Sequence, residues 1–447
     1  MTGTRPDHPM DPAALTDLVT GQALSRRAGP RMLAAFGLAF ALTALLVAAT
    51  VVLLVRGVGI WGIAMPVAWG FAITNYVWWI GIGMAGSFIS AALYLTRQGW
   101  RSAFSRHAEA MTVIALAVSG LFPVLHLGRP WFAYWLAPYP DRMGLWPQWR
   151  SALVWDFFAI GTYVVVSLIY FYTGLVPDLA AVRDRARSRG NQVFYGILAL
   201  GWRGGAREWE RHATLSRLLA ALALPLVFSV HSMVALDFSE GLLPGWHSTI
   251  FPPFFVAGAL FSGAAMVLLL SIPMRRGYGL EAIITDAHLD KLARLLLAAG
   301  WVVTYGYVAE VFTAYYGGDR YDIAMIEHRM TGAYAWIFWS TILCNSVAIQ
   351  ALWWRRVRAS PAALLVISVL VLAGMWLERF MLIVTSLYRD YLPSSWGMFY
   401  PTFWDIAFLL GSMGLFVLLF LVFLRYLPIL SLAELRRDAA ASAKGSP

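Results

Sequence analysis

The stretch PVAWGFAITNYVWWIGIGMAGSFISAALYLT, residues 66–96, contains no charged side chain. A transmembrane helix needs about 20 apolar residues in a row, so this stretch is long enough to cross a bilayer. Nine more segments of this kind occur, and the ten expected spans are residues 32–55, 66–96, 108–127, 152–174, 214–237, 252–273, 292–316, 331–353, 361–386 and 402–427. The sequence therefore predicts an all-α, polytopic membrane protein with about ten transmembrane helices.

The overall composition agrees with this prediction. The chain of 447 residues is 60% hydrophobic and 13% charged, and its mean hydropathy is +0.66. A soluble domain cannot bury that much apolar surface, so the lipid bilayer is an expected partner. The net charge of +10 comes from arginines in short loops between apolar runs, which does not indicate nucleic-acid binding. The one cysteine, Cys344, excludes an iron–sulfur cluster held by this chain alone.

Lysine and arginine are concentrated in alternate loops. The basic set consists of the N-terminal segment, the C-terminal tail and the loops around residues 97–106, 178–212, 275–276 and 355–358. Basic loops remain on the cytoplasmic side. We therefore expect a bacterial inner-membrane protein with both termini in the cytoplasm. Residues 1–30 and 431–447 would be cytoplasmic segments on either side of a membrane domain at 31–430, and the loop 178–212 is expected to carry a short surface helix.

The other loops are rich in tryptophan, tyrosine and proline, as in RPWFAYWLAPYPDRMGLWPQWR (129–150) and LYRDYLPSSWGMFYPTFWD (387–405). Aromatic side chains with a polar edge favour the membrane interface. These loops are either an ordinary interfacial belt or a docking face for another subunit.

Ionisable side chains inside the spans are the main candidates for a functional site, because each is costly to place in hydrocarbon. Their predicted positions share the outer half of the membrane, whereas the inner half is expected to be nearly free of charge. The residues concerned are His126, Asp156, Asp237, Glu310, Glu378 with Arg379, and Asp405.

His126, Asp156 and Asp237 suit the oxidation of a quinol, which releases two electrons and two protons from a lipid-soluble ring. A neutral histidine accepts a proton near neutral pH, and a partly desolvated carboxylate accepts another. We assign catalytic and quinol-binding roles to these three residues. Glu378 and Arg379 are further quinol-binding candidates.

Each assignment has a structural alternative. In these alternatives, His126 would be an interfacial residue and Asp156 would be a helix N-cap. Glu378 and Arg379 would form a structural ion pair, and Asp405 would be a carboxylate at a helix N-terminus. A proton pathway would use His231, Glu310, Tyr305 and Asp405, although His231 also fits a core position. His126 and His231 are expected at different depths, so neither haem nor any other metal site is expected.

Four segments resemble the NrfD/PsrC family of quinone-interacting membrane subunits. They are VAWGFAITNYVWWIGIGMAGSFISAALYL (67–95), RHAEAMTVIALAVSGLFPVLHLGRPW (106–131), SALVWDFFAI (151–160) and HSMVALDFSEGLLPGWHSTIFPPFFVAGALFSG (231–263). Within this family the chain is most similar to the ActC type of subunit in alternative complex III. Met84 departs from that pattern, because we would expect a histidine there in relatives.

The resemblance implies two four-helix bundles, at residues 60–240 and 250–390, with one extra helix at each end, the last at 402–427. It also implies a haem-free quinol pocket at His126, Asp156 and Asp237, with Arg379 as a further candidate. Electrons would pass to a peripheral iron–sulfur subunit and multihaem cytochrome c subunits on the periplasmic face, next to a paralogous membrane subunit. Proton translocation is a further expectation, and no activity is expected of the chain alone.

Two other functions remain open at this point. The nearest is a NrfD/PsrC-type membrane anchor of a periplasmic molybdopterin oxidoreductase, such as polysulfide or tetrathionate reductase. The other is a transporter, which would place its substrate site near the midplane, between interrupted helices.

Overall fold

The computed structural model describes residues 12–25, 29–137 and 148–443. Within these residues ten helices are long and apolar enough to cross a membrane, which confirms the all-α, polytopic fold. These helices are Pro30–Arg56 (α2), Phe71–Leu95 (α3), Ser105–His126 (α4), Ala152–Arg185 (α5), Ala206–Ser239 (α7), Phe251–Tyr278 (α8), Asp286–Gly317 (α9), Ala335–Trp353 (α11 with η4 and η5), Pro361–Leu387 (α13) and Phe403–Tyr426 (α14).

The eighth span is interrupted in its middle. α11 ends at Ile342, a π-helical turn (η4) covers Leu343–Val347, and a 3₁₀ segment (η5) covers Ala348–Trp353. Such π turns inside helices often mark functional positions.

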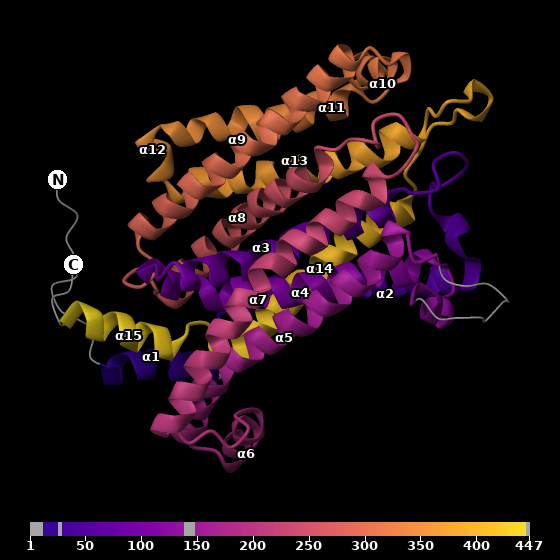
Figure 1. The fold of residues 1–447 in the computed structure, drawn as a ribbon. Coiled ribbons are helices and arrows are strands. Elements are labelled where there is room, and N and C mark those ends of the chain that lie inside the picture. The colour runs from indigo at the N-terminus through magenta and orange to yellow at the C-terminus, as the bar shows by residue number, and fades with distance from the viewer. Residues whose placement is uncertain (1–11, 26–28, 138–147, 444–447) are drawn as a thin grey trace.

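Shorter helices lie outside the spans. α1 (Pro12–Leu24), α6 (Arg189–Leu198), α12 (Arg355–Arg358) and α15 (Leu432–Ala443) gather at one end of the bundle, and α10 (Arg320–Thr331) lies at the opposite end (Figure 1). α6 is the surface helix expected within 178–212. The loop itself is shorter than predicted, because α5 continues to Arg185.

α3 and α8 form the centre of the molecule, since most of each span is buried by protein, whereas α2 faces outward along most of its length. Glycines allow the central helices to approach closely. A Cβ on Gly86 would lie 2.1 Å from the carbonyl oxygen of Ala108 on α4, and one on Gly263 would lie 1.8 Å from the Cβ of Ala85. Small residues at helix interfaces are the usual device for tight packing in membranes.

The remaining helices surround this centre. α3, α4, α5 and α7 pack in a ring, as do α8, α9, α11–η5 and α13, while α2 packs on α14. This arrangement supports the predicted bundles at 60–240 and 250–390, which stay a prediction.

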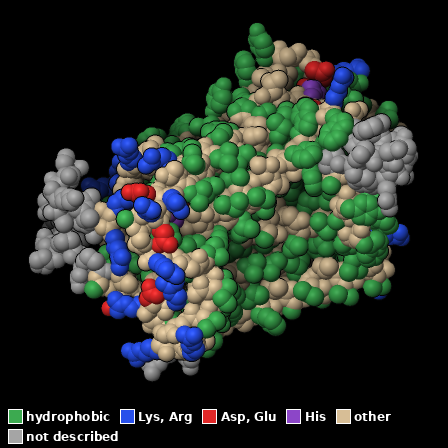
Figure 2. Space-filling model, turned by 60° about the horizontal axis from the view of Figure 1, so that its bottom comes forward, with side chains coloured by type: hydrophobic (Ala, Val, Ile, Leu, Met, Phe, Trp, Pro, Cys, Tyr) green, Lys and Arg blue, Asp and Glu red, His purple; other side chains and the backbone are tan. Residues whose placement is uncertain are grey.

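Charged side chains collect at the ends of the molecule and leave an apolar belt between them (Figure 2). We call the end that carries α1, α6, α12 and α15 the basic end, and the opposite one the aromatic end. The basic end is the one that the sequence predicts to be cytoplasmic. Arg26 and Arg27 of the N-terminal segment and Arg142 of the loop 129–150 lie outside the described residues.

Candidate functional site

Two carboxylates and a tyrosine from three helices meet at the aromatic end. The Tyr76 hydroxyl on α3 donates a 2.9 Å hydrogen bond to Oδ2 of Asp156 on α5. Asp237 on α7 lies within electrostatic range of both side chains. We call Tyr76, Asp156 and Asp237 the carboxylate cluster.

Helix direction explains why the two acids meet. Asp156 lies in the second turn of α5, and Asp237 lies in the last turn of α7. Because α5 and α7 pack together in opposite directions, the start of one lies beside the end of the other. Ser151 occupies the N-cap of α5, so Asp156 is not the helix cap considered as its alternative role.

Asp156 is buried, Tyr76 and Asp237 are half-buried, and among the described residues no cation faces either carboxylate. Asp156 is only 6% exposed. The charged groups that act on Asp237 are Asp156 and Glu240, both of them acids. One oxygen of each carboxylate, Oδ1 of Asp156 and Oδ1 of Asp237, is buried and has no hydrogen-bond partner among the described residues. Two like charges in a low-dielectric site disfavour ionising together, so the pair is suited to take up a proton.

His126 ends α4 and is half-buried, with its ring stacked on Trp61 at a centroid distance of 5.9 Å and an interplanar angle of 11°. Its Nδ1 is buried, and no residue that the structure describes forms a hydrogen bond with it. Ser119, seven residues earlier, bonds the backbone carbonyl of Tyr76. Seven residues are two turns, so His126 lies on the same face of α4 and about 10 Å closer to the aromatic end. It therefore lies outward of the Tyr76 backbone carbonyl.

Glu378 and Arg379 belong to a second cluster, in the other half of the molecule. Arg379 Nη1 lies 3.0 Å from Glu378 Oε1, so the ion pair considered for them is present. Tyr307 donates a hydrogen bond to Glu378 and accepts one of 2.8 Å from Asn345, which lies in the π turn. Both charged residues are almost fully buried. Among the described residues, no hydrogen bond or ion pair joins Glu378 or Arg379 to Asp156 or Asp237.

His231 lies in the core between α7 and α3. It is 1% exposed, and its Nδ1 contacts the sulfur of Met84. Met84 is the position where a histidine was expected, so the two residues form a packed pair. Arg379 lies within electrostatic range of His231. A relay through His231 stays a prediction, and the contact with Met84 supports the core alternative.

The other proton-pathway candidates have separate surroundings. Glu310 pairs with the buried Arg329 at 2.7 Å. Asp405 accepts hydrogen bonds of 2.8 Å from the backbone N–H groups of Thr402 and Gly62, in the capping arrangement that starts α14. Tyr305 is 67% exposed on α9. These positions do not form a continuous chain of hydrogen bonds within the described residues.

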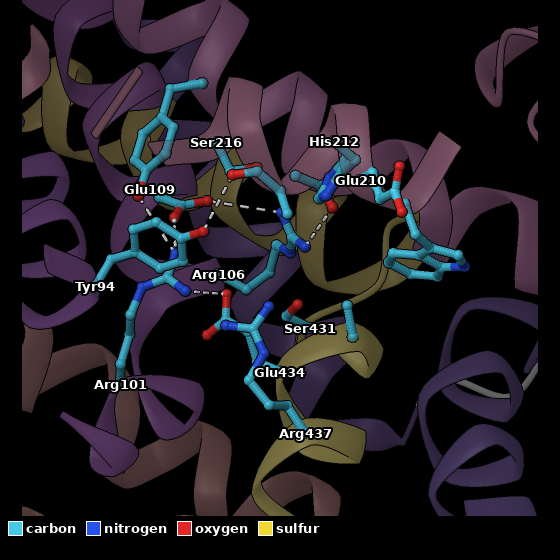
Figure 3. Close-up of a pocket in the computed structure, with 15 residues that line it drawn as sticks. Tyr94, Arg101, Arg106, Glu109, Glu210, His212, Ser216, Ser431, Glu434 and Arg437 are labelled. Carbon is cyan, nitrogen blue, oxygen red and sulfur yellow. Dashed lines mark hydrogen bonds and ion pairs between the residues drawn. The ribbon is translucent and has the colours of Figure 1, made fainter. Parts of the chain in front are cut away.

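The expectation of a nearly charge-free inner half is wrong, because a buried ion network occupies the basic end (Figure 3). Arg106 lies 2.6 Å from Asp178 and 3.6 Å from Glu109, and Arg101 pairs with Glu109 at 3.5 Å and with Glu434 on α15. Asp178 was expected in a loop, whereas α5 carries it inside the bundle. Every acid in this network faces an arginine, unlike the acids of the carboxylate cluster.

Electrostatics at Arg101, which lies between α3 and α4, reflect this pairing. Burial works against its charge, but Glu434, Tyr170 and Glu109 face it and hold the pKa of the guanidinium above its usual range. The network therefore ties the C-terminal helix α15 to the bundle.

Sequence reasoning missed Tyr76, Asn345 and the burial of Arg329. Tyr76 stands in the uncharged run 66–96, where a search for ionisable side chains finds no candidate. Arg329 was counted with the outer loops, whereas it is 1% exposed and also bonds Thr385 and Ser386. No group of three or more His, Cys, Asp or Glu side chains that could hold a metal occurs in the part of the chain that the structure describes.

Comparison with known proteins identifies the family. Residues 60–389 match the family described as "Polysulphide reductase, NrfD", which is well over half of the chain. The chain belongs to the NrfD family. The membership expected from the four quoted segments is thereby confirmed.

Two relatives align along most of this NrfD-family chain. A putative membrane subunit of dimethyl sulfoxide reductase from Halobacterium salinarum is 26% identical over 427 residues, covering 88% of this chain and 92% of the relative. A subunit of selenate reductase from Mesobacillus selenatarsenatis is 21% identical over 380 residues, covering 81% and 86%. The NrfD-family chain is thus similar to subunits of membrane-associated oxidoreductases, and the closer resemblance to ActC stays a prediction.

Proposed function

We propose that this NrfD-family subunit oxidises a quinol from the bilayer and sends its electrons to a peripheral oxidoreductase subunit at the aromatic end. The observation that carries the proposal is the pair of unpaired carboxylates, Asp156 and Asp237, held with Tyr76 inside a membrane bundle. Oxidising one quinol to the quinone releases two protons and two electrons. The protons need acceptors at the site, and the electrons need an acceptor outside this chain.

The residues of the aromatic end divide these tasks. Asp156, held by Tyr76, accepts the proton of one quinol hydroxyl. His126 accepts the other through its free Nδ1 and, lying outward, releases it toward the periplasm. Asp237 takes up the proton from Asp156, since a like-charged neighbour favours sharing one proton between the two. Glu378 and Arg379 act on the site through the field of their ion pair.

The surface of the aromatic end supports docking of a peripheral subunit. Several of its tryptophans and tyrosines are strongly exposed, namely Trp131, Trp135, Trp149 and Tyr400. Exposed aromatic side chains are common at the centre of protein interfaces. We propose that this face is covered by an iron–sulfur subunit and that the basic end lies in the cytoplasm of a bacterial cell.

The two relatives favour a particular assembly. Because both are named as subunits of reductases, we propose that the chain anchors a periplasmic molybdopterin oxidoreductase and supplies it with electrons from quinol. The alternative complex III assembly, with multihaem cytochromes, a paralogous membrane subunit and coupled proton translocation, rests on the motif resemblance. Identifying the polypeptides and redox centres of the purified complex distinguishes the two assemblies. Bound haem c would support only the alternative complex III assembly.

Quinol oxidation is tested with neutral variants of similar shape, Asp156→Asn, Asp237→Asn and His126→Gln, in the purified complex. General acid–base groups contribute about 10²- to 10⁴-fold, so quinol-dependent turnover should fall by at least about 100-fold. A reduced dye that feeds electrons directly to the peripheral subunit should support unchanged turnover. Asp286→Asn, an exposed change at the basic end, is the control. Quinol turnover within twofold of wild type in all three site variants would refute the assignment.

A further inference from the structure

A groove lies at the basic end, where α2, α8 and α14 meet α1. Its cavity volume is about 1180 Å³, compared with about 350 Å³ for the cavity beside the ion network. The groove has apolar walls and a basic rim. Its walls are formed mainly by Leu269, Leu270, Leu365, Val417, Phe420 and Leu421.

Three arginines form the rim of the groove. Arg31 begins α2, Arg276 lies in the last turn of α8, and Arg425 lies in the last turn of α14. Arg31 and Arg276 are exposed, and Arg425 donates a hydrogen bond to the backbone carbonyl of Ser25. None of these three arginines takes part in the ion pairs formed among the described residues.

The acidic residue at the groove does not neutralise this rim. Asp17 on α1 lines it, but its carboxylate pairs with Arg185 at 2.7 Å. The rim therefore keeps a surplus of positive charge from three separate helices. Such a surplus attracts an anion, and at this position in the bundle the nearest anions are lipid headgroups.

The depth of the groove matches one leaflet of a bilayer. Val417 lies eight residues from Arg425 on α14, and Leu269 lies seven residues from Arg276 on α8. At ~1.5 Å per residue the apolar wall extends about 10–12 Å from the arginines. One leaflet contributes about 15 Å of the ~30 Å hydrocarbon core. Acyl chains can thus lie along the wall while their headgroup stays at the rim.

We propose that this groove binds an anionic phospholipid, with the phosphate at Arg31, Arg276 and Arg425 and the acyl chains along the leucine wall. A zwitterionic lipid is a weaker ligand, because its own ammonium group offsets the phosphate charge. The lipid would join the flanking pair α2–α14 to α8, at a place where the helices leave a gap. This role is independent of quinol oxidation.

The test measures lipids retained by the purified complex after exchange into mixed phosphatidylglycerol and phosphatidylcholine, using native mass spectrometry. Arg31→Gln/Arg276→Gln removes two rim charges, and each is expected to contribute about fivefold to anionic lipid binding. The double variant should therefore retain phosphatidylglycerol at least tenfold less well. Arg207→Gln/Arg211→Gln is the control, because it makes the same charge change at exposed positions of α7 outside the groove. This control variant should retain phosphatidylglycerol as well as wild type does.

Leu270→Trp provides a second variant, which keeps every charge and fills the apolar wall. It should lose the lipid as well, with assembly of the complex checked by gel filtration. Equal retention of the two lipids by wild type would overturn the proposal. The proposal would also be wrong if both groove variants retained as much phosphatidylglycerol as the α7 control. Crosslinking of a second protein to a Leu270→Cys variant would likewise contradict it, because a protein would then occupy the groove.

Discussion

Replacing Tyr76 with phenylalanine removes one oxygen atom from the carboxylate cluster and leaves the ring in place. The hydroxyl donates its 2.9 Å hydrogen bond to Asp156, whose other oxygen already lacks a partner. A hydrogen bond to a charged group is worth about 1.5–3 kcal/mol. At ~1.36 kcal/mol per tenfold change, quinol turnover should fall by about 10- to 150-fold. Tyr76 acts by holding Asp156, so kcat should fall while KM for quinol changes less than about threefold.

Tyr163 supplies a matched control. It is a fully buried tyrosine on α5, and its hydroxyl bonds the backbone carbonyl of Met84 on α3 at 3.2 Å. Tyr163→Phe therefore removes a buried hydroxyl from the same helix pair without touching a carboxylate. Both variants should show a similar, small loss of thermal stability.

The assay is steady-state quinol oxidation by the purified complex, with dye-driven turnover measured in parallel. Tyr76→Phe should slow only the quinol reaction, and Tyr163→Phe should slow neither. If the two variants had equal quinol turnover, the idea that Tyr76 holds a proton-accepting carboxylate would be wrong. A loss of dye-driven turnover in Tyr76→Phe would instead show a general defect of assembly.

Three further predictions concern other parts of the bundle. Arg106→Ala leaves the buried Asp178 without a cation, so it should destabilise the protein by about 3–5 kcal/mol, seen as a lower melting temperature in detergent. Gly263→Val places a Cβ where only 1.8 Å separates it from α3, so the two central helices must move apart and the yield of folded protein should fall. Tyr307→Phe removes the hydroxyl bonded to Glu378 and should lower quinol turnover. Tyr305→Phe changes an exposed side chain and should leave quinol turnover unchanged. Equal effects of the two variants would argue against a functional role of the second cluster.

Much of the site follows from depth along the chain. His126, Asp156 and Asp237 stand near span ends that topology assigns to one side, and the structure places all three at the aromatic end. The depth of a residue along its span does not reveal, however, which side chains it contacts. Asp156 and Asp237 lie within electrostatic range of each other, His126 stacks on Trp61, and Glu378 pairs with Arg379. These differences depend on which way each helix face points.

The error at the basic end has a related cause. Asp178 follows a proline and precedes a basic stretch, which predicts a loop, but α5 continues through Pro177. Packing of α15 and α1 against this part of the molecule buries the charges, and paired arginines make that burial tolerable. Hydropathy alone cannot reveal a charge that is neutralised by a distant part of the chain.

By itself, the sequence determined the ten spans and the contrast between a basic and an aromatic end. Each of these depends on the transfer of one local segment between water and lipid, which its own residues settle. Only the tertiary structure decided that Tyr76 holds Asp156, that His231 packs on Met84, and that Arg106 neutralises Asp178. Those pairings depend on the rotation and close approach of helices far apart in the chain, which are set by contacts such as those of Gly86 with α4 and of Gly263 with α3.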